Sequence, residues 1–356
     1  MAITLFPAPP PDPTKSLIEN ALELTPVADI GPDVFTNTRP LWHPPGARGI
    51  YGGAAIAQCL SAAQKTVPPN FLPHSMHCYF VLAGDAQLPI LYHVERVRDG
   101  KSYATRTVQA RQQGRPIFTT TLSFDRVGNG GQDLLTHSGQ MPKVSLPEPN
   151  GTNWDHKGPF ETRRIGIAYA DRPAAERSLH QFVRARGKIS PEGGRHAHLT
   201  ALAYMSDSMF IGTVSSVQGI PRFSSRRAFK TAISDLNNPS DLEAQSIKYL
   251  NDLVEVEAKT LQENGVTPPP GPKNEKPEVT MMVSLDHTIY FHDRSVFGAD
   301  DWIFTDMSSP WAGEGRGFVA QKMWTRDGRL IATCVQEGVV RLKQHSKPEP
   351  SGASKL

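Results

Sequence analysis

The order of the predicted elements repeats along the chain, and this repeat constrains the fold more than any single motif does. In the first half, a helix of small residues over 52–63 is followed by four strand-like runs that end at turn residues: 74–82, 88–97, 102–110 and 116–124. In the second half, two runs (160–165 and 179–188) lead into an apolar helix over 198–210, and four more runs follow: 283–291, 302–306, 317–324 and 330–342. The sequence therefore predicts an α+β fold made of a duplicated unit, one buried helix wrapped by an antiparallel sheet.

Two hairpin turns support the repeat because their chemistry matches. Residues 113–117 read QGRPI and residues 327–331 read DGRLI, so aligning Gly114 with Gly328 superposes the two units. Open antiparallel edges invite pairing. We therefore expect the two sheets to join edge to edge, and we expect whole chains to associate further into a homo-oligomer.

A chain of 356 residues is too long for one ordinary hydrophobic core, and changes in composition along the chain indicate where its domains begin and end. We predict a first domain over 1–127, a linker rich in Gly, Pro and Ser over 128–150, and a second domain over 151–345. The second domain carries an insertion over 215–278, within which 241–261 has the apolar spacing of an amphipathic helix. Because the insertion ends in a proline-rich segment, we expect it to be a surface excursion from the core.

The polar tail over 346–356 ends in Ser354, Lys355 and Leu356. This tripeptide is the signal that the peroxisomal import receptor reads, and a receptor-read signal has to be exposed. We therefore expect that receptor to be a partner and the peroxisomal matrix to be the location.

Charge balance and cysteine count argue against several other classes of protein. There are 38 Lys and Arg against 35 Asp and Glu, so the net charge of +3 gives no reason to expect a nucleic-acid partner. Three cysteines without metal-type spacing favour a reducing compartment over a disulfide framework. No apolar run approaches the roughly 20 residues of a transmembrane helix, so we expect no membrane span.

The sequence also gives no reason to expect a metal or a cofactor. His196 and His198 have no Cys or acidic partner at ligand spacing, which favours a solvated pair at a helix start. The glycine-rich segment 313–317 lacks the spacing and the following helix of a dinucleotide-binding loop.

Asp207 is the acid of interest on the second helix. At about 100° per residue it lies on the flank of the apolar stripe, next to Ala203 and Phe210. It is therefore either a solvated helix acid or a catalytic acid or base that faces a cleft.

The two units differ at the positions where such chemistry would lie. Gln64 or a nearby neutral residue takes the place of Asp207 in the first helix, and the hairpin alignment puts Leu122 opposite Gln336. Only the second unit carries this combination of polar groups, so we expect a single site there.

Six segments carry a resemblance to a known family: 74–80 (HSMHCYF), 98–103 (RDGKSY), 114–118 (GRPIF), 284–287 (SLDH), 316–318 (RGF) and 333–338 (TCVQEG). On these segments, which span most of the chain outside the insertion, the sequence resembles the type II acyl-CoA thioesterases of bacteria and peroxisomes. The resemblance implies a double hotdog fold and the hydrolysis of fatty acyl-CoA to a free fatty acid and CoA. It thus names acyl-CoA as the substrate.

The resemblance also implies a catalytic trio in the second unit: Asp207, Ser284 and Gln336. We expect these residues to hold a water for direct attack on the thioester carbonyl, with Asp207 accepting its proton. The competing route makes Asp207 itself the nucleophile, through a mixed anhydride. The sequence departs from the family at Ser284, where relatives commonly have Thr, and at Ala54, where they often have Gln.

Two other functions remain open at this stage. A protein of the same fold can bind acyl-CoA without catalysis, in which case Ser284 is a strand hydroxyl and Gln336 makes a cross-strand hydrogen bond. A hotdog hydratase-like enzyme is the second alternative. The resemblance disfavours it, because hydratases of this fold place a His about five residues beyond the acid, and the residues around Gly212 include none.

Overall fold

A computed structural model describes residues 3–42, 49–131, 135–147, 158–221, 259, 261–263, 265–268, 277–294 and 297–343. The elements of the first half are α1 (Leu17–Leu22), β1 (Leu24–Pro26), β2 (Val34–Asn37), α2 (Gly52–Gln64), β3 (Phe71–Phe80), β4 (Leu91–Asp99), β5 (Tyr103–Gln112) and β6 (Arg115–Arg126). Those of the second half are β7 (Phe160–Ala168), η1 (Ala174–Glu176), β8 (Ser178–Ala185), α3 (Gly194–Met205), α4 (Thr213–Ser216), β9 (Val279–Ser284), β10 (Asp286–Phe291), β11 (Ile303–Gly313), β12 (Arg316–Thr325) and β13 (Leu330–Leu342).

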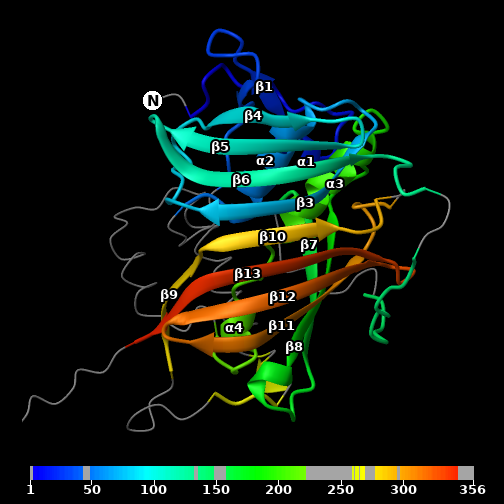
Figure 1. Ribbon diagram of the computed structural model, residues 1–356. Coiled ribbons are helices and arrows are strands. Elements are labelled where there is room, and N and C mark those ends of the chain that lie inside the picture. The colour runs from blue at the N-terminus through cyan, green and yellow to red at the C-terminus, as the bar shows by residue number, and fades with distance from the viewer. Residues whose placement is uncertain are drawn as a thin grey trace, which may run out of the picture.

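All described strands belong to one antiparallel sheet (Figure 1). The order is β1-β2-β4-β5-β6-β3-β10-β13-β12-β11-β8-β7, with β9 paired to β13 beside this path. The two halves have the same internal order and meet at β3 and β10, where His77 lies opposite Thr288. The predicted duplication and the predicted edge-to-edge pairing of the two sheets are therefore confirmed, and the fold is a double hotdog.

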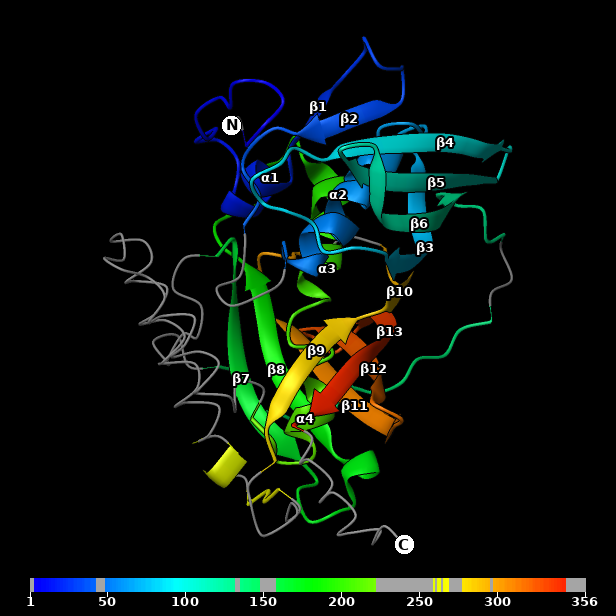
Figure 2. The same ribbon diagram turned by 90° about the vertical axis from the view of Figure 1, so that its left-hand side faces the viewer.

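The two long helices, α2 and α3, pack against each other on the inner side of the sheet (Figure 2). They run antiparallel, so the start of α2 lies at the end of α3. A Cβ added to Gly53 would lie 2.3 Å from the carbonyl oxygen of Tyr204, and the hydroxyl of Tyr51 donates a 3.0 Å hydrogen bond to the same oxygen. Glycine at position 53 is therefore what permits the close helix contact.

The second helix is shorter than the sequence predicts. Its apolar pattern continues to Phe210, but α3 ends at Met205, Ser206 caps it, and Met209 turns the chain with a φ of 59°. The segment after α3 stays apolar because it crosses the buried inner face of the sheet. A Cβ added to Gly338 of β13 would lie 2.5 Å from Ile211 in this segment. The prediction of a helix to residue 210 is wrong, and Asp207 lies in a turn just beyond the helix.

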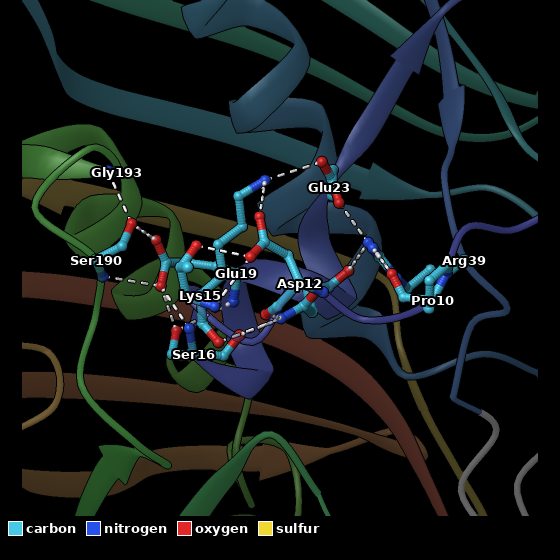
Figure 3. Close-up of polar contacts among 11 residues, drawn as sticks. Pro10, Asp12, Lys15, Ser16, Glu19, Glu23, Arg39, Ser190 and Gly193 are labelled. Atoms are coloured by element: carbon cyan, nitrogen blue, oxygen red, sulfur yellow. Dashed lines mark hydrogen bonds and ion pairs between the residues drawn. The ribbon is translucent and has the colours of Figure 1, made fainter.

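The N-terminal helix α1 ties the first half to the second (Figure 3). Ser16 caps α1 in a capping box with Glu19, and Glu19 also accepts hydrogen bonds from the backbone N–H and the hydroxyl of Ser190, at 3.0 and 2.6 Å. Burial alone would raise the pKa of Glu19, but the hydrogen bonds from Ser16 and Ser190 outweigh it and hold the pKa below its usual value. This carboxylate fixes the loop that leads into α3.

Part of the predicted linker packs on the outer face of the second half of the sheet. Met141 and Val144 contact an aromatic cluster of Phe182, Trp302, Phe304 and Trp324, and the indole N–H of Trp324 donates to the carbonyl of Gly139 at 3.3 Å. This stretch is therefore an ordered cover for an aromatic sheet face.

The insertion is described only at its two ends. The predicted helix over 241–261 lies outside the described residues except at 259 and 261, and the tail with Ser354, Lys355 and Leu356 lies wholly outside them. At the returning end of the insertion, Leu261 and Val266 are buried in the main core, so this end is not the surface excursion that the sequence predicts. No described helix is long and apolar enough to cross a membrane. The predicted domain boundaries at 127 and 151 stay predictions.

Candidate active site

Asp207 and Gln336 lie together at the end of α3. Asp207 is in the turn that follows the helix, and Gln336 is on the inner face of β13, where its side chain is fully buried. The Gln336 Nε2 donates a 3.0 Å hydrogen bond to the Asp207 Oδ1 although the two residues are 129 positions apart. The structure thus brings two of the three predicted site residues into direct contact.

The first half also contributes to this place, through the start of α2. A Cβ added to Gly52 would lie 2.7 Å from the Asp207 Oδ2 and 2.9 Å from the ring of Phe80. The carboxylate is therefore packed against the first residue of α2, and only a glycine leaves room for it. The positive end of a helix favours a negative charge, and the Asp207 carboxylate lies at this end of α2.

Ser284 reaches the same face of the sheet through a β-bulge. In β9, Ser284 lies opposite Gly338, and in β10, Thr288 lies opposite Val335, which puts His287 opposite Gln336. The three residue steps from Ser284 to His287 thus match only two residue steps, from Gly338 to Gln336, on β13. The extra residue is Leu285, whose N–H donates to the carbonyl of Glu337 at 2.9 Å.

The sequence predicts a single strand over 283–291, and the bulge between β9 and β10 shows that this prediction is wrong. In a regular strand, Ser284 and His287 would point to opposite faces because their spacing is odd. The bulge turns both toward the inner face that carries Gln336. Ser284 is half-buried and makes no side-chain hydrogen bond to a described residue, so it is a diagonal neighbour of Gln336 and does not contact it through a hydrogen bond.

His287 is a site residue that the sequence analysis did not select. Its Nδ1 lies 3.3 Å from the Gln336 Nε2, and its Nε2 lies 3.1 Å from the hydroxyl of Ser206. Complete burial lowers the pKa of His287 to about 3, so the ring is neutral. Two sequence signals were available, its place at the end of the family segment 284–287 and its position three residues after Ser284. The odd spacing, however, predicts opposite sheet faces for the two residues.

The first half lacks this polar arrangement at the corresponding positions. Leu122 of β6 lies opposite Met76 of β3, as Gln336 lies opposite His287, and both apolar side chains are fully buried. Gln64, at the end of α2, accepts a hydrogen bond from Thr200 at 2.9 Å. The described residues therefore contain one acidic site at the helix–sheet junction, in the second half.

Neither the site nor the rest of the described chain offers a set of metal ligands. Among the described residues, no group of three His, Cys, Asp or Glu side chains is placed to hold an ion. The site therefore provides a carboxylate, an amide, a hydroxyl and a neutral imidazole next to a helix N-terminus. These groups are suited to proton transfer and to hydrogen bonding.

Two family models match the chain in tandem. A model of the acyl-CoA thioesterase N-terminal domain matches residues 39–125, and one of the acyl-CoA thioesterase C-terminal domain matches residues 139–340. The chain is 32% identical to human acyl-coenzyme A thioesterase 8, over 94% of this chain and 92% of that protein. It is 26% identical to peroxisomal acyl-coenzyme A thioester hydrolase 1 of Saccharomyces cerevisiae, over 91% and 94%.

Solved structures give the same picture of the fold. The acyl-CoA thioesterase II TesB2 of Mycobacterium marinum superposes with a TM-score of 0.62 at 26% identity, over 93% of this chain and 99% of that one. A hot dog fold protein from Alicyclobacillus acidocaldarius superposes with a TM-score of 0.55, over 91% and 97%. At 15% identity this second likeness concerns the fold alone.

Proposed function

The chain belongs to the acyl-CoA thioesterase family and hydrolyses acyl-CoA thioesters, and from that premise we propose that Asp207, Gln336 and Ser284 carry the reaction. The observation that supports this proposal best is the 3.0 Å hydrogen bond between Gln336 and Asp207. It joins a turn and a strand that are distant in sequence, at a place where the corresponding residues of the first half, Leu122 and Met76, are apolar. The packing of an apolar core does not require this hydrogen-bonded polar pair.

The chemistry follows from the groups present. The Asp207 carboxylate accepts a proton from a water as the water oxygen bonds to the thioester carbonyl carbon, and the carbonyl oxygen becomes an oxyanion. The tetrahedral species then expels the CoA thiolate and leaves a free acid. A thiolate leaves readily because a thiol pKa is about 8.5. No acyl-enzyme is formed on this route.

The oxyanion requires hydrogen-bond donors, and we assign this role to the start of α2. The first N–H groups of a helix have no intrahelical acceptor. Those of Gly52 and Gly53 donate to no described residue, and Gly52 lies against Asp207. Ser284 supplies a hydroxyl on the same sheet face to orient the water or the substrate.

Exchange of Asp207 for Asn tests the assignment with almost no change in shape. We expect Asp207→Asn to lower kcat by at least two orders of magnitude and to leave KM nearly unchanged, because binding lies in other contacts. The exposed Asp29→Asn variant removes the same charge elsewhere and serves as the matched control. A kcat for Asp207→Asn within tenfold of the wild type would exclude Asp207 as the general base.

Hydrolysis in ¹⁸O-labelled water separates the two routes. In a single turnover, direct attack puts the label only into the product acid. A mixed anhydride on Asp207 puts the label into the enzyme carboxylate when water attacks the aspartyl carbon, and the product acid then carries an unlabelled oxygen from Asp207. Label in Asp207 would refute the direct route.

We also propose that the protein acts in the peroxisomal matrix. The support is the terminal Ser354, Lys355 and Leu356 together with the similarity to the yeast enzyme, which is named as peroxisomal. A tagged chain that lacks these three residues should lose peroxisomal localisation, and an unchanged pattern would contradict the proposal.

Association between chains is a further proposal. The sheet ends in two edge strands, β1 and β7, and its outer face exposes Tyr79 and Tyr290 on either side of the seam between the halves. Such edges and faces favour contact with a second copy. Light scattering should give a multiple of the 39.1 kDa chain mass, and a mass of one chain would contradict this.

A further inference from the structure

The orientation of the Gln336 amide decides what the site can do. A planar amide can be turned over so that its nitrogen and oxygen change places. In the orientation observed, Nε2 faces Asp207 at 3.0 Å and His287 at 3.3 Å, so each of its two hydrogens has an acceptor. In the reverse orientation, Oε1 would face the carboxylate of Asp207, and the two acceptors would repel each other.

The tautomer of His287 is set from the other side of the ring. The hydroxyl of Ser206 donates its one hydrogen to the carbonyl of Ala203 at 2.9 Å. It therefore acts as the acceptor toward His287 Nε2, at 3.1 Å, and Nε2 must carry the ring hydrogen. A neutral imidazole with its hydrogen on Nε2 has an acceptor at Nδ1.

The surroundings keep the ring neutral. The ring of Phe210 packs against it in a T-shaped arrangement with 5.4 Å between ring centroids, and Cys78 lies opposite it in β3. Burial raises the pKa of the Cys78 thiol to about 12 and also raises that of Cys334 on β13, so both thiols stay protonated. Asp207 and Asp286 are acidic groups next to this cluster, and Gln336 stands between Asp207 and His287.

We propose that His287 is a positioning residue for Gln336: its Nε2–H tautomer presents Nδ1 as an acceptor and thereby holds the amide with Nε2 toward Asp207. This inference rests on the proposed function of the site. It also gives a role to the Gln336 Oε1, which is buried and accepts no hydrogen bond from the described residues. With both N–H groups occupied, Oε1 is the acceptor left to bind a hydrogen of the attacking water beside the carboxylate.

Two substitutions of His287 test the proposal as a matched pair. The Asn side chain places its amide near the position of Nδ1, so His287→Asn retains an acceptor for Gln336 and loses the bond to Ser206. The longer Gln side chain reaches the position of Nε2, so His287→Gln retains the bond to Ser206 and loses the acceptor. We expect His287→Asn to retain kcat within about threefold, and His287→Gln to lose about 10- to 100-fold in kcat with KM unchanged within about twofold, since misplacement of a catalytic group by about 1 Å can cost about 100-fold.

A purely structural role would give a different pattern. It would lower the melting temperature of both variants and affect kcat equally in both. In a Gln336→Leu background, moreover, His287→Gln should change kcat by less than about twofold, because the amide it positions is gone. Equal losses in the two single variants, or an undiminished loss in the Gln336→Leu background, would overturn the proposal.

The tautomer can be observed without any turnover. In the ¹⁵N-labelled wild-type protein, long-range proton–nitrogen spectra at pH 7 should show His287 with a protonated Nε2 and an unprotonated Nδ1. A hydrogen on Nδ1 would refute the inference even in an active enzyme. If the wild type released no thiol from acyl-CoA, the proposed function would fail while the tautomer result would still decide this inference.

Discussion

Replacing Gln336 with leucine would give the second half the residue that the first half has at the same place, Leu122. The change removes the hydrogen bond from Nε2 to Asp207 and keeps a side chain of similar size on the inner face of β13. A hydrogen bond to a charged group contributes about 1.5–3 kcal/mol. If that stabilisation is lost from the transition state, kcat falls by about 10- to 150-fold at 1.36 kcal/mol for each factor of ten.

The effect of Gln336→Leu on stability should be small by comparison. The change leaves the Nδ1 of His287 without a donor, which costs about 1–3 kcal/mol for a buried acceptor. The leucine buries more apolar surface than glutamine does, at about 25 cal/mol per Å², and this gain opposes the loss. We therefore expect the free energy of unfolding to change by less than about 2 kcal/mol.

Release of the CoA thiol, followed with a chromogenic disulfide, gives kcat and KM for Gln336→Leu, and thermal unfolding gives its stability. The volume-conserving Leu122→Met exchange in the first half is the control and should leave kcat within about twofold. A folded Gln336→Leu protein with kcat within threefold of the wild type would refute the reasoning, because Gln336 would then contribute nothing in the transition state.

Four further outcomes are expected. Ser284→Ala should lower kcat about tenfold while Ser284→Thr, which keeps the hydroxyl, stays near the wild type; equal rates for both would exclude a role for the hydroxyl. Gly53→Ala should lower the free energy of unfolding in urea by about 1–3 kcal/mol, because its Cβ would meet Tyr204 at 2.3 Å, whereas Gly139→Ala, with open space around it, should be neutral. Glu19→Gln should destabilise by about 1 kcal/mol at pH 7. Because the pKa of Glu19 is lowered on folding, this difference should be present above pH 4.5 and disappear as the pH falls through the folded pKa; a difference that does not shrink as the pH falls below 4.5 would contradict the assignment. Because folding lowers the pKa of His287 to about 3, this residue should contribute a loss of up to about 1.4 kcal/mol of stability for each pH unit from 6.5 down to about 3, and His287→Asn should remove that part of the slope.

The duplicated fold can be predicted from the sequence because its signals are local. Hairpin turns such as those at Gly114 and Gly328, with alternating strands on either side, fix the order of elements within each half. The end of α3 cannot be predicted in this way, because Ser206, Ser208 and Phe210 stay buried beyond it although they are no longer helical. Apolar residues indicate that a segment is buried, but they do not show whether it is helical. Here the helix ends because the chain turns to cross the inner face of the sheet.

Long-range features of the site were not accessible to the same reasoning. His287 joins Gln336 only because an extra residue, Leu285, shifts the register of one strand against its neighbour, and nothing in a strand pattern announces such a shift. The contact between Glu19 and Ser190 spans 171 positions, and no local periodicity encodes it. Asp207 and Gln336 could be paired beforehand only through resemblance to a family.

The packing of Gly52 against Asp207 has a consequence for how the two halves can evolve and be engineered. The first half has no counterpart of Asp207, yet its helix α2 supplies the end against which the Asp207 carboxylate packs. Neither half is therefore an independent module: expressed alone, each should be inert, and activity should return only when the two fragments reassemble. Substitutions at the buried Leu122 have to remain apolar and of similar volume, whereas any side chain at position 52 of the same half would have to displace the Asp207 carboxylate and the Phe80 ring.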